Sequence, residues 1–166
     1  MGIFILIGII GETVDKCGEP DHVIPDPFYK THMDEYIDIP NLTHATEEPY
    51  ITGKVITINI TEKKLDDILN KLPSELRAKN HDEVGMVVWL EWGRTLVGTY
   101  TGGAKGYAHT CNVTLINFVN NTIIDEQYFR GTDPPEIKVV GGDAYGSMPT
   151  QDIVDYIKGL PQKLVR

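Results

Sequence analysis

The fold is decided by the stretch from Val84 to Gly131, which reads VGMVVWLEWGRTLVGTYTGGAKGYAHTCNVTLINFVNNTIIDEQYFRG. Its apolar run at 86–90 puts large side chains on both faces, which is typical of a central strand covered on two sides. From residue 107 the sequence alternates, and one face is made of Tyr107, His109, Cys111, Val113 and Leu115. The stretch therefore predicts consecutive β-strands.

Short connections separate these predicted strands. Gly93 and Arg94 can turn the chain, so we expect a strand over 83–91 and a returning strand over 95–101. Asn120 and Asn121 predict a two-residue hairpin turn, because asparagine tolerates positive φ. Connections of this length cannot hold a helical crossover, so the strands should be antiparallel neighbours.

The flanking segments predict one more strand and two helices. Residues 53–61 alternate in the manner of a half-buried strand. A helix over 61–73 is indicated by Thr61 as its N-cap, by Pro73 at its end and by an apolar stripe of Leu65, Ile68, Leu69 and Leu72. A second amphipathic helix runs from Thr150 to Gly159. The predicted class is α+β, a four- to five-stranded antiparallel sheet with two amphipathic helices and an extended acidic N-terminal arm.

Charge is unevenly distributed along the 166 residues, whose formal net charge is −9. Residues 11–50 contain ten acidic side chains against two basic ones, together with five of the ten prolines. We interpret 11–50 as an acidic, Pro-rich arm and 51–166 as the α+β domain. The sequence has no basic stripe that would neutralise phosphates, which argues against nucleic-acid binding.

Residues 1–10 form a separate apolar segment, in which residues 3–10 include five isoleucines. This run is shorter than the roughly 20 residues that a membrane-spanning helix needs. It also lacks the basic n-region and the small-residue cleavage site of a signal peptide. A buried strand, an exposed tail and the remnant of a membrane anchor, which would tether the protein through 3–10, all stay open.

Localisation is indicated by four Asn-x-Thr sequons, which begin at Asn41, Asn59, Asn112 and Asn120. As N-glycosylation candidates they favour an extracytoplasmic or membrane-associated location over a cytoplasmic one. Outward-facing Asn and Thr on strands and turns would explain the same pattern. Cys17 and Cys111 are far apart in sequence, so a disulfide between arm and body and two free thiols both stay open.

Candidate reactive residues are few. His109 and Cys111 share a strand face, but residues i and i+2 in a strand lie roughly 6.5–7 Å apart, beyond the reach of a base that must take the thiol proton. His22, His32 and His44 lie among carboxylates and offer zinc ligands, yet their spacings of 10 and 12 residues match no compact ligand pattern. We expect no cofactor or metal and disfavour an enzyme.

Aromatic side chains are the better candidates for a binding site. Trp92, Tyr100, Tyr107 and Tyr145 would supply contact area for a protein or a small ligand, or else pack in the core. The expected function is therefore a non-enzymatic, exported or membrane-tethered interaction or ligand-binding domain. Two alternatives stay open: a small enzyme with its site near His109 and Cys111 or in the loop at 131–148, and a structural subunit whose arm wraps a partner chain, including a second copy of itself.

Overall fold

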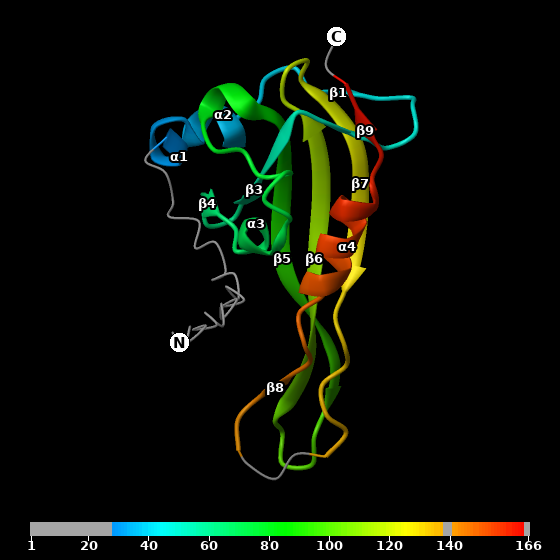
Figure 1. The fold of residues 1–166 in the computed structure, drawn as a ribbon. Helices are drawn as coiled ribbons and strands as arrows, with labels where there is room; N and C mark the ends of the chain where they lie inside the picture. The colour runs from blue at the N-terminus through cyan, green and yellow to red at the C-terminus, as the bar shows by residue number, and fades with distance from the viewer. Residues whose placement is uncertain (1–27, 138–140, 165–166) are drawn as a thin grey trace, which may run out of the picture.

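The structure is a computed structural model that describes residues 28–137 and 141–164. Its main element is a mixed sheet with the strand order β1-β7-β6-β5-β3-β4, to which β8 adds beside β6 (Figure 1). The four longest strands are β3 (Lys54–Asn59), β5 (Val84–Thr99), β6 (Lys105–Asn117) and β7 (Thr122–Arg130). The α+β class is confirmed.

Shorter elements surround this sheet. They are α1 (Phe28–Thr31), α2 (Met33–Ile37), β1 (Thr43–His44), β2 (Ile51–Thr52), β4 (Lys64–Leu65), α3 (Ile68–Lys71), the 3₁₀ helix η1 (His81–Glu83), β8 (Ala144–Tyr145), α4 (Thr150–Gly159) and β9 (Gln162–Lys163). β2 and β9 pair in parallel as a second, two-stranded sheet. No helix in the described ranges is long and apolar enough to cross a membrane.

The prediction of an antiparallel sheet of four to five strands is only partly right. β5, β6 and β7 are antiparallel neighbours as expected, but β3 pairs with β5 in parallel. The connection over 60–83 contains β4, α3 and η1, so it is long enough to carry the chain back to the same end of the sheet. Two-residue strands such as β1 and β8 have no periodicity of their own, and the sequence does not predict them.

The turn predicted at Gly93 and Arg94 is wrong, because β5 continues through both residues. Trp92, Gly93 and Arg94 pair in unbroken register with Cys111, Thr110 and His109. The chain reverses instead at Gly102 and Gly103, whose φ angles of 101° and 90° suit glycine. The result is one long β5–β6 hairpin whose end projects beyond the rest of the sheet (Figure 1). The second predicted turn is partly right: the chain does reverse between β6 and β7, with Asn121 at φ 53°, but the connection is the four residues 118–121 and not two.

Of the two predicted helices, α4 forms as expected and the helix over 61–73 does not. After β3 the chain turns through Lys63, at φ 51°, and β4 pairs antiparallel with β3. Helix is left only as the single turn α3, where the Asp66 carboxylate accepts the backbone N–H of Ile68. The apolar stripe still faces inward: Ile68, Leu69 and Leu72 are buried and Leu65 is half-buried.

The second half of the predicted arm packs on the sheet. Tyr29 and Tyr36, on α1 and α2, are buried, and the Trp89 indole donates to the backbone carbonyl of Tyr36 at 2.6 Å. Residues 28–37 therefore contribute to the core. The apolar segment at 1–10 and the first part of the arm lie outside the described residues.

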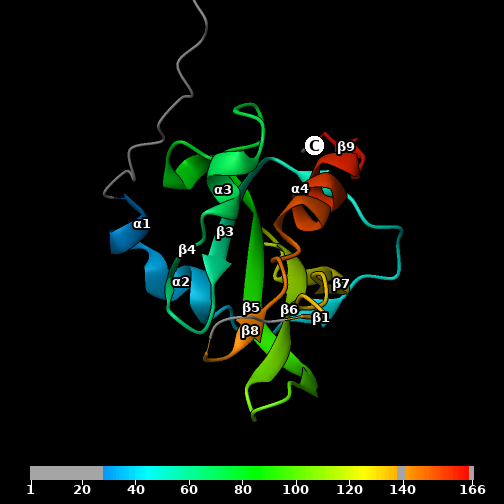
Figure 2. The same cartoon turned by 90° about the horizontal axis from the view of Figure 1, so that it is seen from below.

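One face of the sheet is covered by α3 and α4, which lie side by side (Figure 2). On this face Tyr156 of α4 packs against Phe129, the register partner of Cys111, with ring centroids 5.6 Å apart. Neither helix reaches the projecting end of the hairpin (Figure 1).

The connection between β7 and α4 runs along the projecting end of the hairpin and crosses itself where it leaves and rejoins the body. The crossing is close: a Cβ on Gly131 would lie 1.8 Å from the Ser147 carbonyl oxygen, and one on Gly146 would lie 1.7 Å from that of Thr132. The hydroxyls of Thr132 and Ser147 are hydrogen-bonded at 2.9 Å. Only glycine fits at both positions. The close packing of the two backbone segments and the hydrogen bond between them hold the loop, with β8, against β6.

Candidate functional site

The uncovered end of the hairpin gathers aromatic and cationic side chains on one face. We define the distal face by the residues Trp92, Arg94, Leu96, Tyr107, His109 and Tyr145. Register places them together: Arg94 lies opposite His109, Leu96 opposite Tyr107, and Tyr107 beside Tyr145 of β8. It is the same face that α3 and α4 cover nearer the body.

Three rings and one guanidinium form a continuous stack on the distal face. Tyr145 stacks on both Tyr107 and His109, with centroid distances of 5.6 and 5.7 Å. The Arg94 Cζ lies 4.9 Å from the centroid of Tyr107, and its Nη1 donates to the Tyr145 hydroxyl at 3.2 Å. The guanidinium is therefore held in place by aromatic rings and a hydroxyl.

The charge of Arg94 is oriented but not neutralised. Within residues 28–137 and 141–164, no carboxylate forms an ion pair with it, even though the chain is strongly acidic. An exposed guanidinium in this state has donors free for a carboxylate from outside.

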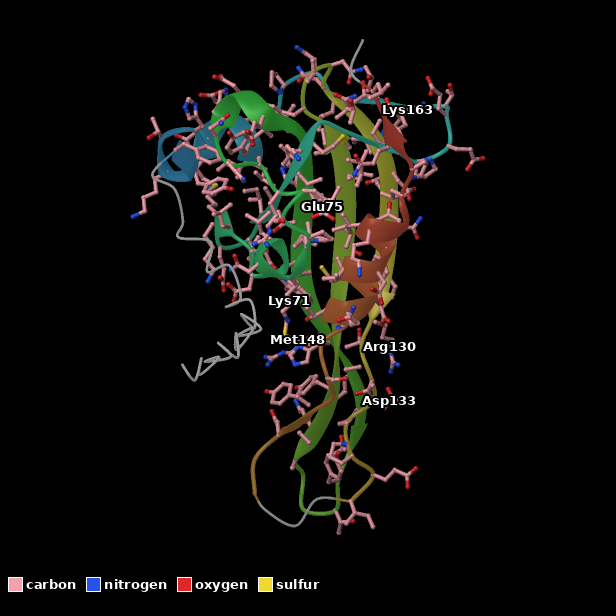
Figure 3. All side chains as sticks on the ribbon, viewed as in Figure 1. Lys71, Glu75, Arg130, Asp133, Met148 and Lys163 are labelled. Carbon is pink, nitrogen blue, oxygen red and sulfur yellow. The ribbon has the colours of Figure 1, made fainter. Side chains whose placement is uncertain are left out.

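A cleft of about 540 Å³ adjoins the distal face where the hairpin meets α3 and α4. Lys71 and Met148 lie at this junction (Figure 3), and the cleft is also lined by Trp92 and His109. The Trp92 indole N–H donates to Asp66 Oδ2 at 2.7 Å, while Asp66 Oδ1 accepts the Ile68 N–H. Asp66 is thus already engaged and holds Trp92 at the edge of the cleft.

Large apolar side chains are exposed beside these polar groups. Leu96 is 52% exposed, Met148 47% and Tyr145 43%. Tyr and Arg are the residue types that dominate binding energy at protein interfaces, and Met is enriched there. This surface therefore combines residue types that are common at protein interfaces.

Sequence reasoning selected three residues of the distal face as binding candidates and His109 only as a candidate reactive residue, and it missed others. Trp92, Tyr107 and Tyr145 lie together, whereas Tyr100 packs elsewhere, on Gly106 and Pro134, and donates its hydroxyl to the carbonyl of Pro135. The missed residues are Arg94, Leu96 and Met148. In a continuous β5, Trp92, Arg94 and Leu96 follow one another at intervals of two residues and therefore lie on the same face. The turn wrongly expected at Gly93 prevented this prediction.

Among the described residues, no hydrogen bond joins His109 to Cys111. His109 stacks on Tyr145 and lines the cleft, while Cys111 is fully buried and donates its thiol to the Asn112 carbonyl at 3.6 Å. Burial raises the pKa of the Cys111 thiol to about 12, so at neutral pH it is protonated. Cys17 lies outside the described residues.

The candidate metal ligands fall in different places. His22 is outside the described residues, and His44 is exposed on β1. His32 lies in a cluster with Glu35 and His81, in which His32 Nδ1 is 2.8 Å from Glu35 Oε1 and His81 Nε2 is 3.8 Å from Glu35 Oε2. The hydrogen bond from His32 holds the pKa of Glu35 below its ordinary value. Sequence spacing gave no signal for His81, because the fold brings it to α2 from far along the chain.

The sequons divide by exposure. Asn41, Asn112 and Asn120 are exposed, and Asn112 donates to Glu91 at 3.1 Å. Asn59 is buried, and its carboxamide oxygen accepts the backbone N–H of Glu62. A glycan on Asn59 is therefore incompatible with the folded state, whereas the other three positions leave room for one.

Comparison of the chain with protein-family models, with curated proteins and with solved structures finds no match to any of them.

Proposed function

We propose that this chain is a non-enzymatic interaction domain that binds a protein partner through the distal face. The observation that carries the proposal is Arg94, which is oriented by Tyr107 and Tyr145 and has no carboxylate partner in the described part of the chain. The partner surface it fits presents a carboxylate surrounded by apolar side chains, which would contact Leu96 and Met148.

Preorganisation supports this use of the hairpin. Side chains that order only on binding lose conformational entropy, roughly 0.5–1.5 kcal/mol for each long side chain. Arg94 is already stacked and hydrogen-bonded, and the loop that presents Tyr145 is fastened by the crossing at Gly131 and Gly146. Binding therefore needs little further ordering of this surface.

The proposal includes an exported or membrane-tethered location, which three exposed sequons support. The alternative of a thiol enzyme at His109 and Cys111 has less support, because the thiol is buried and protonated. The arm-wrapping alternative has less support too, because residues 28–37 pack on their own sheet.

The experiment compares affinity enrichment by three tagged forms of the full chain in cells of its native host, with quantitative mass spectrometry. The forms are wild type, the double variant Arg94→Ala with Tyr145→Ala, and Tyr128→Ala, which removes an exposed tyrosine on β7 outside the distal face. We expect a partner that wild type and Tyr128→Ala enrich equally and that the double variant loses by about tenfold or more. Equal recovery by all three forms, or no partner for wild type, would contradict the proposal.

A further inference from the structure

We propose that His32, Glu35 and His81 form a binding site for a zinc-class divalent cation, separate from the distal face. One potential ligand atom from each residue lies within 4.8 Å of the other two. The imidazoles of His32 and His81 stack with centroids 3.9 Å apart, and the Glu35 carboxylate reaches a nitrogen of each. Two imidazole nitrogens and one carboxylate oxygen are ligands that zinc accepts.

The distances are close to those of a bound site. Zinc-to-ligand bonds of about 2.0–2.1 Å put the ligand atoms of a tetrahedral site about 3.3 Å apart. No two of the three ligand atoms are more than 4.8 Å apart, so they need to converge by about 1.5 Å at most. Glu35 is exposed and His32 is half-buried at the surface, so rotation of their side chains can supply this movement and the cation can enter from solvent.

A part-buried hydrogen bond orients the third ligand. The Tyr36 hydroxyl lies 2.6 Å from His81 Nδ1, which leaves His81 Nε2 directed at Glu35. Tyr36 is fully buried, and its backbone carbonyl accepts the Trp89 indole N–H. When the ring donates its Nδ1–H to the Tyr36 hydroxyl oxygen, Nε2 is the unprotonated nitrogen that zinc needs, and the hydrogen bond fixes the orientation of the ring.

The cation would join two parts of the fold. His32 and Glu35 belong to the start of α2, whereas His81 begins η1, directly before β5. With three protein ligands the fourth position is left to water, the pattern of an open site. A bound ion would therefore fasten α2 to the segment that leads into β5, a central strand of the sheet.

The test is a titration of the full chain with Zn²⁺ by isothermal calorimetry, together with thermal unfolding with and without Zn²⁺. Wild type should bind one Zn²⁺ per chain and unfold at a higher temperature in its presence. Glu35→Gln and His32→Gln, which change solvent-accessible side chains, should each weaken binding by about tenfold or more. His44→Gln removes an exposed histidine outside the cluster and should bind as wild type does.

Binding of Co²⁺ provides a second readout, which reports the ligand atoms around the ion and not the stability of the fold. Visible absorption of the Co²⁺ complex should report a tetrahedral site with nitrogen and oxygen ligands in wild type and His44→Gln, and the signal should be lost in Glu35→Gln. Equal Zn²⁺ affinity of wild type, Glu35→Gln and His32→Gln, or the absence of both binding heat and thermal stabilisation in wild type, would overturn the proposal.

Discussion

At the scale of single residues, two glycines allow the chain to cross itself beside the hairpin. Gly131→Ala and Gly146→Ala each place a methyl group within 1.8 Å of a backbone carbonyl oxygen, which only a shift of the backbone can relieve. We expect each substitution to lower the free energy of unfolding by about 1–3 kcal/mol. Gly98→Ala is the matched control, because a Cβ there meets no atom within 4 Å. Urea denaturation measures all three, and equal midpoints for Gly131→Ala and Gly98→Ala would contradict the described crossing.

Because of the Cys111 thiol, the free energy of unfolding should depend on pH in the alkaline range. Burial raises its pKa from the ordinary 9.0 to about 12, so between these values the native state keeps a proton that the unfolded chain releases. The contribution is fully present below pH 9 and is lost as the pH rises toward 12, at a rate of at most about 1.4 kcal/mol per pH unit. The free energy of unfolding of wild type should therefore fall between pH 9 and 10 more steeply than that of Cys111→Ala.

The comparison is made between pH 9 and 10 because two buried tyrosines affect the free energy of unfolding only at higher pH. Burial also raises the pKa of Tyr36 and of Tyr156, but from an ordinary value of 10.0. Below pH 10 the difference between wild type and Cys111→Ala therefore reports the thiol. Parallel curves for the two proteins in urea titrations at pH 8, 9 and 10 would show that the thiol is not buried.

At the scale of elements, local patterns predicted a structure only where local interactions decide it. α4 carries its apolar positions over ten residues, and it buries Ile153, Val154 and Ile157 as expected. Residues 61–73 have an equally clear stripe, but pairing of β4 with β3 and the positive φ of Lys63 replace most of the helix. The stripe correctly predicted burial and failed to predict conformation, because a long-range strand pairing overrides intrinsic helix propensity.

The helices at 28–37 are buried to an extent that their amino-acid composition does not predict. An acidic, Pro-rich stretch is typical of a solvated linker, yet Tyr36 on α2 is fully buried against the sheet. Tyr36→Ala should therefore lower the free energy of unfolding by about 3 kcal/mol or more, as for other buried aromatic residues. Tyr128→Ala, at a position 59% exposed, should change it by less than about 0.5 kcal/mol. Chemical denaturation that gave similar losses for both tyrosines would show that α2 is peripheral.

At the scale of the whole molecule, contacts distant in sequence decided what could not be predicted. The parallel pairing of β3 with β5 follows from how the connection over 60–83 packs, and no single segment encodes it. The meeting of His81 with His32 and Glu35 has the same origin. The distal face could be predicted in part from the sequence, because Trp92, Tyr107 and Tyr145 were identified from their residue types. Arg94 was not grouped with them because a turn was wrongly expected at Gly93.

The molecule has a packed part and an exposed part. The sheet near α3 and α4 contains the buried core, whereas the end of the hairpin that projects beyond it (Figure 1) contributes little to the core. Apolar and cationic side chains are exposed there, among them Leu96 and Arg94. Natural proteins rarely leave a contiguous apolar surface exposed without a use. We therefore expect substitutions at the exposed positions Arg94, Leu96 and Tyr145 to affect binding while leaving the free energy of unfolding almost unchanged.

Site-specific photo-crosslinking in cells of the native host tests this central claim most directly. A photoreactive side chain is placed at Leu96 on the distal face and, in a second form of the chain, at Tyr128 on β7, since both positions are exposed. The account predicts a discrete adduct with a partner protein from position 96, its loss when Arg94→Glu is added, and no such adduct from position 128. The same adduct from both positions, or an adduct from position 96 that survives Arg94→Glu, would contradict it.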